Sequence, residues 1–430
     1  MKKKLAINGA SPVRKDFFPA YKTIGREEKQ AVLKTLDSGS LSKFLGTWGE
    51  QFNGGFEVQN LEAEWSKYFN VKHAIAVNSN TSGLFCAVGA AGIEPGDEVI
   101  VTAYSMSASA VAPIVYGGIP VFADIEEDFF CLDVNDIRNK ITSKTKAIIV
   151  VDLFGQAYDV DNINQLAKEH NLIVIEDVAQ APGGKFKKQF TGTLGDIGVF
   201  SLNYHKHIHC GEGGVIVTDD DELAHRCRMI RNHAETIVDK AAYSNIANMI
   251  GFNYRMTEIE ASIAREQLKK LEKLNKKRIE NVNYLEENIG NIPCLSLPKV
   301  RSFTSHVYYV HVLLFDSLVA RIPRNSYVEA LKAELKPFKN REEEGVKIGS
   351  GYTPPLYLQS IYQKKIAFGS NGYPFNLGNY DYSKVKCLVT EKMHYEKLIA
   401  HELFLPSMMK NDLDDVIIAF HKVWENRFEI

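Results

Sequence analysis

Between about residues 55 and 220, the chain alternates short, apolar, β-branched runs with segments of helical pattern, and this alternation limits the possible folds most. Each run is bounded by Gly, Asp, Asn or Pro, as buried strands commonly are. Apolar strands joined by helical crossovers must be covered on both faces, so the pattern predicts an α/β protein with a mostly parallel sheet. The seven runs are HAIAVNS (73–79), DEVIVTA (97–103), IPVFADI (119–125), KAIIVVDLF (146–154), NLIVIEDVA (171–179), IGVFSL (197–202) and GGVIVTDD (213–220).

The remaining segments predict helices and a second region of structure. Within the alternating part, helices are expected over 82–93, 160–171 and 221–233. A long helical pattern over 256–289 has apolar positions at roughly helical spacing and a basic outer face, so it is expected to connect two lobes. Beyond it we expect a strand over 305–316, a helix over 324–335, and a long ordered loop region, rich in Tyr, Gly and Pro, from about 340 to 390.

Composition excludes several classes of protein. The formal net charge of −2 gives no electrostatic reason to expect nucleic acid or an acidic membrane as a partner. No apolar run approaches the ~18 residues of a membrane span, and no apolar stretch follows the basic N-terminus as in a signal peptide. The six cysteines are scattered without CxxC spacing, which is typical of a cytosolic enzyme. We therefore expect a cytoplasmic protein with no nucleic-acid or membrane partner.

Polar residues follow the first predicted strand. Ser79, Asn80 and Thr81 precede an apolar helical segment. Free backbone N–H groups at a helix N-terminus, together with hydroxyl groups, can hold a phosphate. A simple N-cap is the more common role of such residues, and this stretch alone leaves both interpretations open.

Asp177 follows the apolar residues of the predicted strand 171–179. In open α/β sheets, ligands bind at the carboxyl edge of the strands, where this side chain would lie. A carboxylate at that edge can pair with a protonated ring nitrogen of a cofactor. It can equally cap the next turn, and both roles remain open on this evidence.

A single lysine, Lys206, lies among His205, His207 and His209 and precedes Gly-Glu-Gly-Gly. Three alternating imidazoles suggest a metal site, but zinc sites need a fourth ligand or an open catalytic position, and lysine is no ligand at neutral pH. We therefore expect no metal. Hydrogen-bonded loop histidines are one alternative. The other is a reactive lysine that forms a Schiff base with pyridoxal phosphate.

Asn253 and Arg255 lie just before the long helical pattern. From there a second subunit could lend hydrogen-bond donors to a phosphate. A helix cap and a surface arginine are the alternative roles.

Four motifs, in order over residues 75–275, resemble those of the DegT/DnrJ/EryC1/StrS family of sugar aminotransferases. They are SNTSGL, EDVAQAPG, FSLNYHKHIHCGEGG and GFNYRMTEIEAS. The resemblance implies a fold type I pyridoxal-phosphate-dependent transferase. It also implies an N-terminal arm (1–30), a large cofactor-binding domain (31–275) and a smaller C-terminal α+β domain (276–430).

The same resemblance implies roles for single residues. Lys206 would bind pyridoxal 5′-phosphate as a Schiff base and move the proton, and Asp177 would pair with the ring nitrogen. Gln180 would approach the phenolic oxygen. The family is dimeric, so a homodimer with shared active sites is implied. The phosphate would be held by Asn80, Thr81 and Ser201, helped by Asn253 or Arg255 of the second subunit.

The sequence also departs from the family pattern. Asn80 replaces a glycine that is usual there, and Met106 stands where an aromatic ring usually stacks on the cofactor, unless Tyr104 takes that role. Aromatic residues suit a hydroxyl-rich acceptor, although packing between lobes explains them equally well. The candidate acceptor wall consists of His306, Tyr309, Tyr352, Tyr357 and Tyr362.

The expected reaction moves an amino group from an amino acid, glutamate or glutamine, to a keto-sugar, keto-sugar phosphate, nucleotide-linked keto-sugar or keto-cyclitol. The family's dehydratases, which use the amino form of the cofactor, have histidine where this chain has Lys206. A non-catalytic ligand-binding member is the other alternative, against which Lys206 and Asp177 are both present. A nicotinamide enzyme is disfavoured because no GxGxxG follows the first strand.

Overall fold

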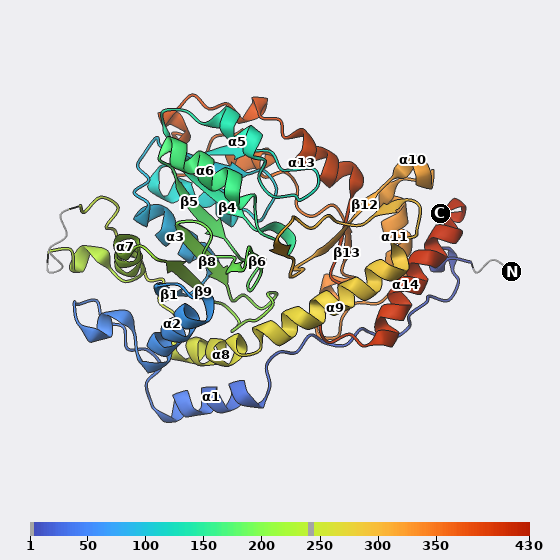
Figure 1. Cartoon of the computed structure of the whole chain (residues 1–430), viewed down its shortest axis with the longest axis horizontal. Coiled ribbons are helices and arrows are strands. Elements are labelled where there is room, and N and C mark those ends of the chain that lie inside the picture. The colour runs from blue at the N-terminus through green and yellow to red at the C-terminus, as the bar shows by residue number, and fades with distance from the viewer. Residues whose placement is uncertain (1–3, 240–244) are drawn as a thin grey trace.

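The computed structural model describes residues 4–239 and 245–430, and its largest sheet has seven strands in the order β1-β9-β8-β5-β4-β2-β3 (Figure 1). Every strand predicted from an apolar run is present, and the expected α/β class with a mostly parallel sheet is confirmed. The strands are β1 (His73–Val77), β2 (Glu98–Thr102), β3 (Ile119–Ala123), β4 (Thr145–Val151), β5 (Ile173–Asp177), β8 (Ile197–Ser201) and β9 (Gly214–Thr218).

One strand, β9, breaks the parallel arrangement. It pairs antiparallel with both β1 and β8, whereas β8, β5, β4, β2 and β3 pair in parallel. Parallel neighbours need a long crossover, usually a helix, but β8 and β9 are joined by the helix-free residues 202–213. The chain therefore turns back at the carboxyl end of β8, and Lys206 lies in this turn.

Helices cover both faces of the sheet, which explains why its strands read as continuous apolar runs. On β1, Ile75 and Val77 pack in one cluster with Leu84 of α3, whereas Ala74 and Ala76 pack on the other face with Trp65 of α2. The covering helices are α2 (Phe56–Phe69), α3 (Asn80–Ala90), α5 (Val134–Lys140), α6 (Val160–His170), α7 (Asp221–Arg231) and α8 (Glu258–Leu268). Helix α1 (Arg26–Asp37) packs on α8.

A second core lies around an antiparallel four-stranded sheet in the order β10-β12-β14-β13. The N-terminal segment joins this core, because the Phe18 ring lies 5.3 Å from that of Phe338, and both described ends of the chain lie on this side (Figure 1). The elements are β10 (Leu295–Ser296), β12 (His311–Phe315), β13 (Ile348–Ser350), β14 (Leu398–His401), α9 (Leu271–Ile289), α11 (Arg324–Glu334) and α14 (Lys410–Glu425). The expected boundary at residues 275/276 falls inside α9, and the division into domains stays a prediction.

The single long helix predicted over 256–289 is wrong. Two helices, α8 and α9, are separated at Lys269 and Lys270. The N-terminal segment holds this break: the Gln267 amide nitrogen donates to the Thr23 carbonyl at 3.0 Å, and Lys270 Nζ pairs with Glu28 at 2.5 Å. A helical period in the sequence does not reveal such tertiary contacts. Helix α9 then runs from the α8 side toward α11 and α14 (Figure 1).

The strand predicted over 305–316 is also shorter than expected, since only His311–Phe315 forms β12. Tyr308 has a left-handed backbone (φ 49°), which interrupts the alternation of a strand. The N–H groups of Val307 and Tyr309 instead bond to the carbonyls of Gly155 and Phe154, at 2.8 Å each. The predicted strand is thus diverted toward the end of β4.

The stretch from 340 to 390 is mainly irregular, as predicted, and several of its tyrosines serve the core. Tyr362 and Tyr382 are buried and pack edge-on against Phe122 of β3, at 4.8 and 5.9 Å between ring centroids. The remaining short elements are α4 (Ala108–Val111), α10 (Ser317–Ala320), α12 (Ser360–Gln363), α13 (Leu388–Lys392), β6 (Lys185–Phe186), β7 (Gln189–Phe190) and β11 (Thr304–Ser305). None of the helices within residues 4–239 and 245–430 has the length and apolar content needed to cross a bilayer.

Candidate functional site

A pocket of about 530 Å³ lies at the carboxyl edge of the main sheet and contains most of the predicted site residues. The ends of β1, β5 and β8 and the turn 202–213 form one side, and the region around Tyr352 and Glu402 forms the other. Ligands of open α/β sheets bind at this edge. The predicted residues that line the pocket are Asn80, Thr81, Met106, Asp177, Gln180, Ser201, Lys206, Tyr309 and Tyr352.

Lys206 is buried in this pocket. Its backbone N–H donates to the Asn203 carbonyl at 2.9 Å, and its Nζ lies 4.2 Å from the centroid of the Tyr309 ring. Burial lowers the pKa of Lys206 to about 8, although the negative charges of Asp177 and Glu402 oppose the shift. The neutral, nucleophilic form of this amine is therefore more populated near neutral pH than that of an exposed lysine, which favours a covalent role.

Asp177 ends β5 and is held at both carboxylate oxygens. Oδ2 accepts from the Ser109 hydroxyl at 2.7 Å, and Oδ1 accepts from the Ala179 N–H at 3.1 Å and from the Asn80 amide nitrogen at 3.2 Å. Burial raises the pKa of Asp177, while these hydrogen bonds and the charge of Lys206 lower it. The carboxylate is thus oriented and faces the pocket.

The start of α3 supplies free backbone donors beside Asp177. Ser79 is the N-cap, and its Oγ accepts from the Ser82 N–H at 3.1 Å. Strand β9 comes very close: a Cβ on Gly214 would lie 2.7 Å from the Ser79 carbonyl oxygen. The Gly-Gly pair therefore allows β9 to pack on the first residues of α3, while Thr81 and Ser201 add hydroxyls at a site suited to an anion.

Gln180 links the two sides of the pocket. Its Oε1 accepts from the Phe154 N–H at 2.8 Å, and its Nε2 donates to the Tyr352 hydroxyl at 3.0 Å. The Tyr352 backbone N–H donates in turn to the Tyr104 hydroxyl at 2.8 Å. Tyr104 is buried behind the lining, so Met106, not Tyr104, forms the pocket wall.

The three histidines around Lys206 point to different surroundings. His207 is buried, with Nε2 3.1 Å from the Val307 carbonyl, and the His205 Nδ1 accepts from Arg341 at 3.1 Å. Burial lowers the pKa of His205, His207 and His209 alike. In the described part of the chain, no three His, Cys, Asp or Glu side chains are grouped to hold a metal ion.

Three residues of the expected acceptor wall, His306, Tyr357 and Tyr362, do not line the pocket. His306 is buried behind it, with its ring stacked on Tyr308 and its Nδ1 accepting from the Tyr308 N–H at 3.0 Å. Tyr357 is buried against Phe122, and its hydroxyl bonds to Glu391. For these two, as for Tyr362, packing explains the residue, because the alternation and aromatic richness of a sequence do not reveal which way a ring faces.

Asn253 and Arg255 also lie outside the pocket of their own chain. Arg255 Nε donates to Asn253 Oδ1 at 2.8 Å, and Arg255 Nη1 donates to Asn232 Oδ1 at 3.1 Å. Their role in the pocket of a second subunit stays a prediction.

Sequence reasoning missed several side chains of the site, among them Ser109, Glu344, Lys347 and Glu402. Ser109 orients Asp177, while Glu344, Lys347 and Glu402 form part of the pocket lining. Glu402 directly follows the apolar strand β14, so the rule that pointed to Asp177 would have singled it out. Glu344 and Lys347 belong to the charged run NREEEGVK, which gives no sign of facing a pocket.

The lining fits pyridoxal 5′-phosphate. Lys206 offers a buried amine for an aldehyde, Asp177 offers a fixed carboxylate for a ring nitrogen, and the start of α3 with Thr81 and Ser201 offers donors for a phosphate. Pyridoxal 5′-phosphate carries an aldehyde, a ring nitrogen and a phosphate, and the protein groups suited to each of them line the same pocket.

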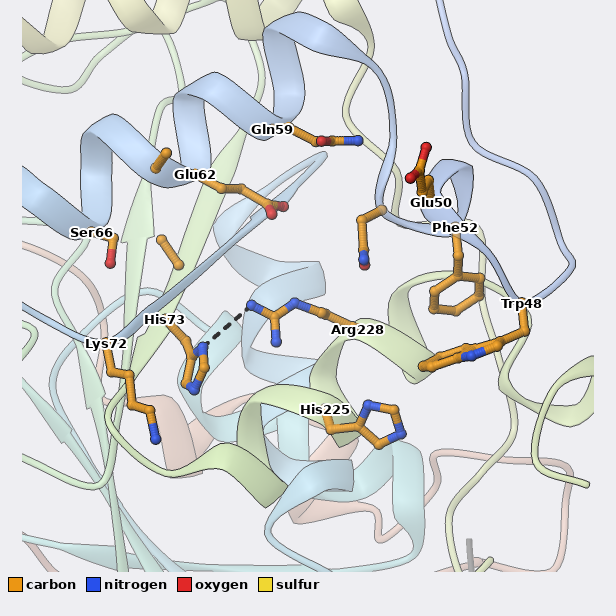
Figure 2. Close-up of a pocket in the computed structure, with 13 residues that line it drawn as sticks. Trp48, Glu50, Phe52, Gln59, Glu62, Ser66, Lys72, His73, His225 and Arg228 are labelled. Atoms are coloured by element: carbon orange, nitrogen blue, oxygen red, sulfur yellow. Dashed lines mark hydrogen bonds between the residues drawn. The ribbon is translucent and has the colours of Figure 1, made fainter. Parts of the chain in front are cut away.

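A second hollow, of about 810 Å³, lies at the amino end of β1 (Figure 2), and its lining does not include Lys206. Trp48, Phe52 and His225 form one part of its lining, and Arg228 reaches toward His73 at 3.5 Å. Its charges are largely paired within the chain: Glu62 bonds Arg231 at 2.6 Å. This hollow shares no lining residue with the pocket that contains Lys206 and Asp177.

Comparison with known proteins gives one consistent result. The model of the DegT/DnrJ/EryC1/StrS aminotransferase family matches residues 22–375. The chain is 33% identical to the spore coat polysaccharide biosynthesis protein SpsC of Bacillus subtilis, over 95% of this chain and 98% of the relative. It is 28% identical to the L-glutamine:2-deoxy-scyllo-inosose aminotransferase of Micromonospora echinospora, over 99% of both chains.

Solved structures agree with this result. An aminotransferase from Psychrobacter cryohalolentis superimposes with a TM-score of 0.80 at 26% identity, over 95% of this chain and 99% of the other. NtdA from Bacillus subtilis, crystallised with bound PMP, superimposes with a TM-score of 0.76 at 26% identity, over 97% of this chain and 87% of the other.

Proposed function

Because the chain belongs to the DegT/DnrJ/EryC1/StrS aminotransferase family, whose members depend on pyridoxal phosphate, we propose that it binds this cofactor through Lys206 and transfers an amino group from an amino acid to the ketone of a sugar or cyclitol. The observation that carries the proposal is the meeting of Lys206, Asp177 and the start of α3 in one pocket.

The chemistry assigns a task to each residue. When bound, the cofactor supplies an electron sink for the carbanion that amino transfer needs. Asp177, fixed by hydrogen bonds from Ser109 and Ala179, would keep a proton on the ring nitrogen. Lys206 would hold the cofactor and, once released, would carry the proton between two carbons; a positioned acid–base group contributes about 10²–10⁴-fold.

The remaining lining residues bind and orient. Thr81, Ser201 and the free N–H groups at the start of α3 would hold the phosphate, while Gln180 would approach the ring oxygen and Met106 would cover the ring; these side chains all line the pocket. The Tyr309 ring, 4.2 Å from Lys206 Nζ, would limit access of water to the amine. Each task is assigned according to the position of the residue in the pocket lining.

We further propose glutamate or glutamine as the donor. Glutamine is the donor named for the Micromonospora relative, whose acceptor is 2-deoxy-scyllo-inosose. A keto-sugar or keto-cyclitol is the matching acceptor class here. The active unit is a homodimer in which Asn253 or Arg255 reaches the phosphate of the second subunit, since neither lines the pocket of its own chain.

A reductive labelling experiment tests the attachment. Borohydride treatment of the holoenzyme, followed by peptide mass spectrometry, is expected to find the cofactor fixed on Lys206. Label on another lysine, or a protein that takes up no cofactor, would refute the proposal.

A further inference from the structure

Four charged side chains form a cluster on the wall of the pocket that faces Lys206. This charged cluster consists of Arg341, Glu344, Lys347 and Glu402. Glu344, Lys347 and Glu402 line the pocket, and Arg341 lies behind them. Their side chains are only 12–27% exposed, so each charge needs a partner.

Within the charged cluster, each carboxylate contacts both cations. Arg341 lies 2.7 Å from Glu344 and 3.1 Å from Glu402, and Lys347 Nζ lies 2.9 Å from Glu344 and 3.3 Å from Glu402. Two positive and two negative charges cancel. The hydrogen bonds to Arg341 hold the pKa of Glu344 at about 2, and the carboxylates raise the pKa of Lys347 although burial alone would lower it. These two groups are therefore charged at neutral pH.

Amino transfer requires this wall of the pocket to bind two chemically different substrates. The same pocket must receive an amino acid, which carries a carboxylate, and then a ring that carries hydroxyls. A carboxylate needs a cation with N–H donors, whereas hydroxyls need acceptors as well as donors. A wall that offered only N–H donors would bind the carboxylate but would leave the hydroxyl protons of the ring without acceptors.

Lys347 is the cation that can leave its partners. When it turns away, Glu344 and Glu402 each keep their contact with Arg341. Arg341 is held more firmly, because it also donates to His205 Nδ1 at 3.1 Å and uses two nitrogens on Glu344. The lysine ammonium moves on a flexible stem, whereas the guanidinium is a planar fork.

Glu402 is suited to the other substrate. One oxygen lies 3.3 Å from Lys347 Nζ, and the other accepts from Arg341 at 3.1 Å. A carboxylate has about four lone-pair sites, so each oxygen can accept a further hydrogen bond from a hydroxyl. Tyr352, whose oxygen accepts from Gln180, lies on the same wall and can donate.

We propose that Lys347 binds the carboxylate of the amino donor by exchanging it for its own carboxylate partners, and that Glu402 accepts hydrogen bonds from hydroxyls of the acceptor ring. The inference rests on the proposed amino transfer. It makes Lys347 a determinant of the donor and Glu402 a determinant of the acceptor, and it defines the acceptor as a ring with hydroxyls near the ketone.

Separate half-reactions test this division. Four holoenzymes are compared: wild type, Lys347→Met, Lys347→Arg and Glu402→Gln. In the donor half-reaction each is mixed with L-glutamine or L-glutamate alone. In the acceptor half-reaction the amino form of each is mixed with a keto-inositol alone, and cofactor absorbance is followed in both. Lys347→Met is expected to raise the donor concentration for half-maximal rate about 10-fold or more, as loss of a charge-assisted hydrogen bond does, with the acceptor step within about 2-fold. Lys347→Arg is expected to recover part of the loss. Glu402→Gln is expected to show the reverse pattern.

Binding without reaction separates this inference from the proposed function. Calorimetry on the same holoenzymes uses glutarate, a dicarboxylate without an amino group, and scyllo-inositol, a polyol without a ketone. Lys347→Met is expected to weaken only glutarate, and Glu402→Gln only scyllo-inositol. The matched controls, Lys339→Met and Glu343→Gln, alter exposed residues near the charged cluster and are expected to change neither.

The inference is overturned if both variants weaken the same compound, if both weaken the two compounds equally, or if wild-type protein binds neither. Amino acids that leave the cofactor of wild-type protein unchanged would contradict the proposed function instead, whatever the calorimetry shows.

Discussion

At the scale of single residues, the environment of Lys206 decides how the site behaves with pH. Burial lowers its pKa from 10.5 to about 8, against the opposing charges of Asp177 and Glu402. Only the neutral amine attacks an aldehyde, and lysine is neutral above its pKa. In cofactor-free protein, the rate of pyridoxal phosphate uptake is therefore expected to rise with pH around a midpoint near 8. Stopped-flow absorbance measures this rate.

The Asp177→Asn variant sharpens this test, because Asp177 raises the pKa of Lys206 and its loss moves the midpoint to lower pH. A wild-type midpoint near 10, as for an exposed lysine, or a midpoint that moves to higher pH in Asp177→Asn, would contradict the buried environment described for Lys206. The same variant is expected to retain cofactor but lose most turnover, since no carboxylate then holds the ring proton.

Ser109 gives a second prediction at this scale. Its hydroxyl donates to Asp177 Oδ2 at 2.7 Å and lowers the pKa of that carboxyl. Hydrogen bonds to charged groups contribute about 1.5–3 kcal/mol, so Ser109→Ala is expected to reduce kcat about 10-fold or more. The acid limb of the pH–rate profile should move to higher pH in Ser109→Ala, because the Asp177 carboxyl then protonates more easily. Ser107→Ala, which removes a nearby hydroxyl that makes no capping bond, is the control in the same pH–rate profiles.

At the scale of elements, the strands of the main sheet could be predicted from the sequence, but the points at which a helix or a strand is interrupted could not. Apolar runs buried on both faces identify every strand of the main sheet, because burial on two faces leaves a direct mark on the sequence. The break between α8 and α9 depends on Thr23 and Glu28, more than 200 residues away, and the shortened β12 depends on a left-handed Tyr308. Such contacts leave no local pattern.

The close approach of β9 to α3 gives a prediction for an element. A Cβ at Gly214 would lie 2.7 Å from the Ser79 carbonyl oxygen, so Gly214→Ala must push the start of α3 away from its place. Pyridoxal phosphate is expected to bind more weakly and the Tm to fall. Gly46→Ala, whose Cβ would meet only the His233 ring at 3.8 Å, is the control. Unchanged cofactor affinity in Gly214→Ala, measured by fluorescence titration, would show that α3 does not hold the phosphate.

At the scale of the whole molecule, the motifs located one side of the pocket and missed much of the other. Strand ends place Asp177, Ser201 and Lys206 together, because parallel strands end at one edge. Glu402 and Lys347 come from the second core, and only the packing of that core on the main sheet brings them to Lys206. His306 and Tyr357 do not line the pocket, because their rings pack inside the protein on Tyr308 and Phe122.

Sharing of sites between two subunits is testable by complementation. Lys206→Ala is expected to be inactive because it lacks the amine. An Asn253/Arg255 double substitution to Ala is expected to be inactive because it lacks the donors for the neighbouring phosphate. Mixed dimers of the two variants should recover part of the activity, since one of their two sites is intact. Verified mixed dimers without recovery would show that each site belongs to one chain.

The transfer of the amino group itself is tested most directly by following its nitrogen. Holoenzyme is incubated with glutamine or glutamate labelled with ¹⁵N at the amino group and with a keto-cyclitol or keto-sugar, and the product is analysed by mass spectrometry. We expect an amino product that carries ¹⁵N, formed by wild-type protein and not by Lys206→Arg. A deoxy product without nitrogen, or an amino product that still forms with Lys206→Arg, would contradict amino transfer through Lys206.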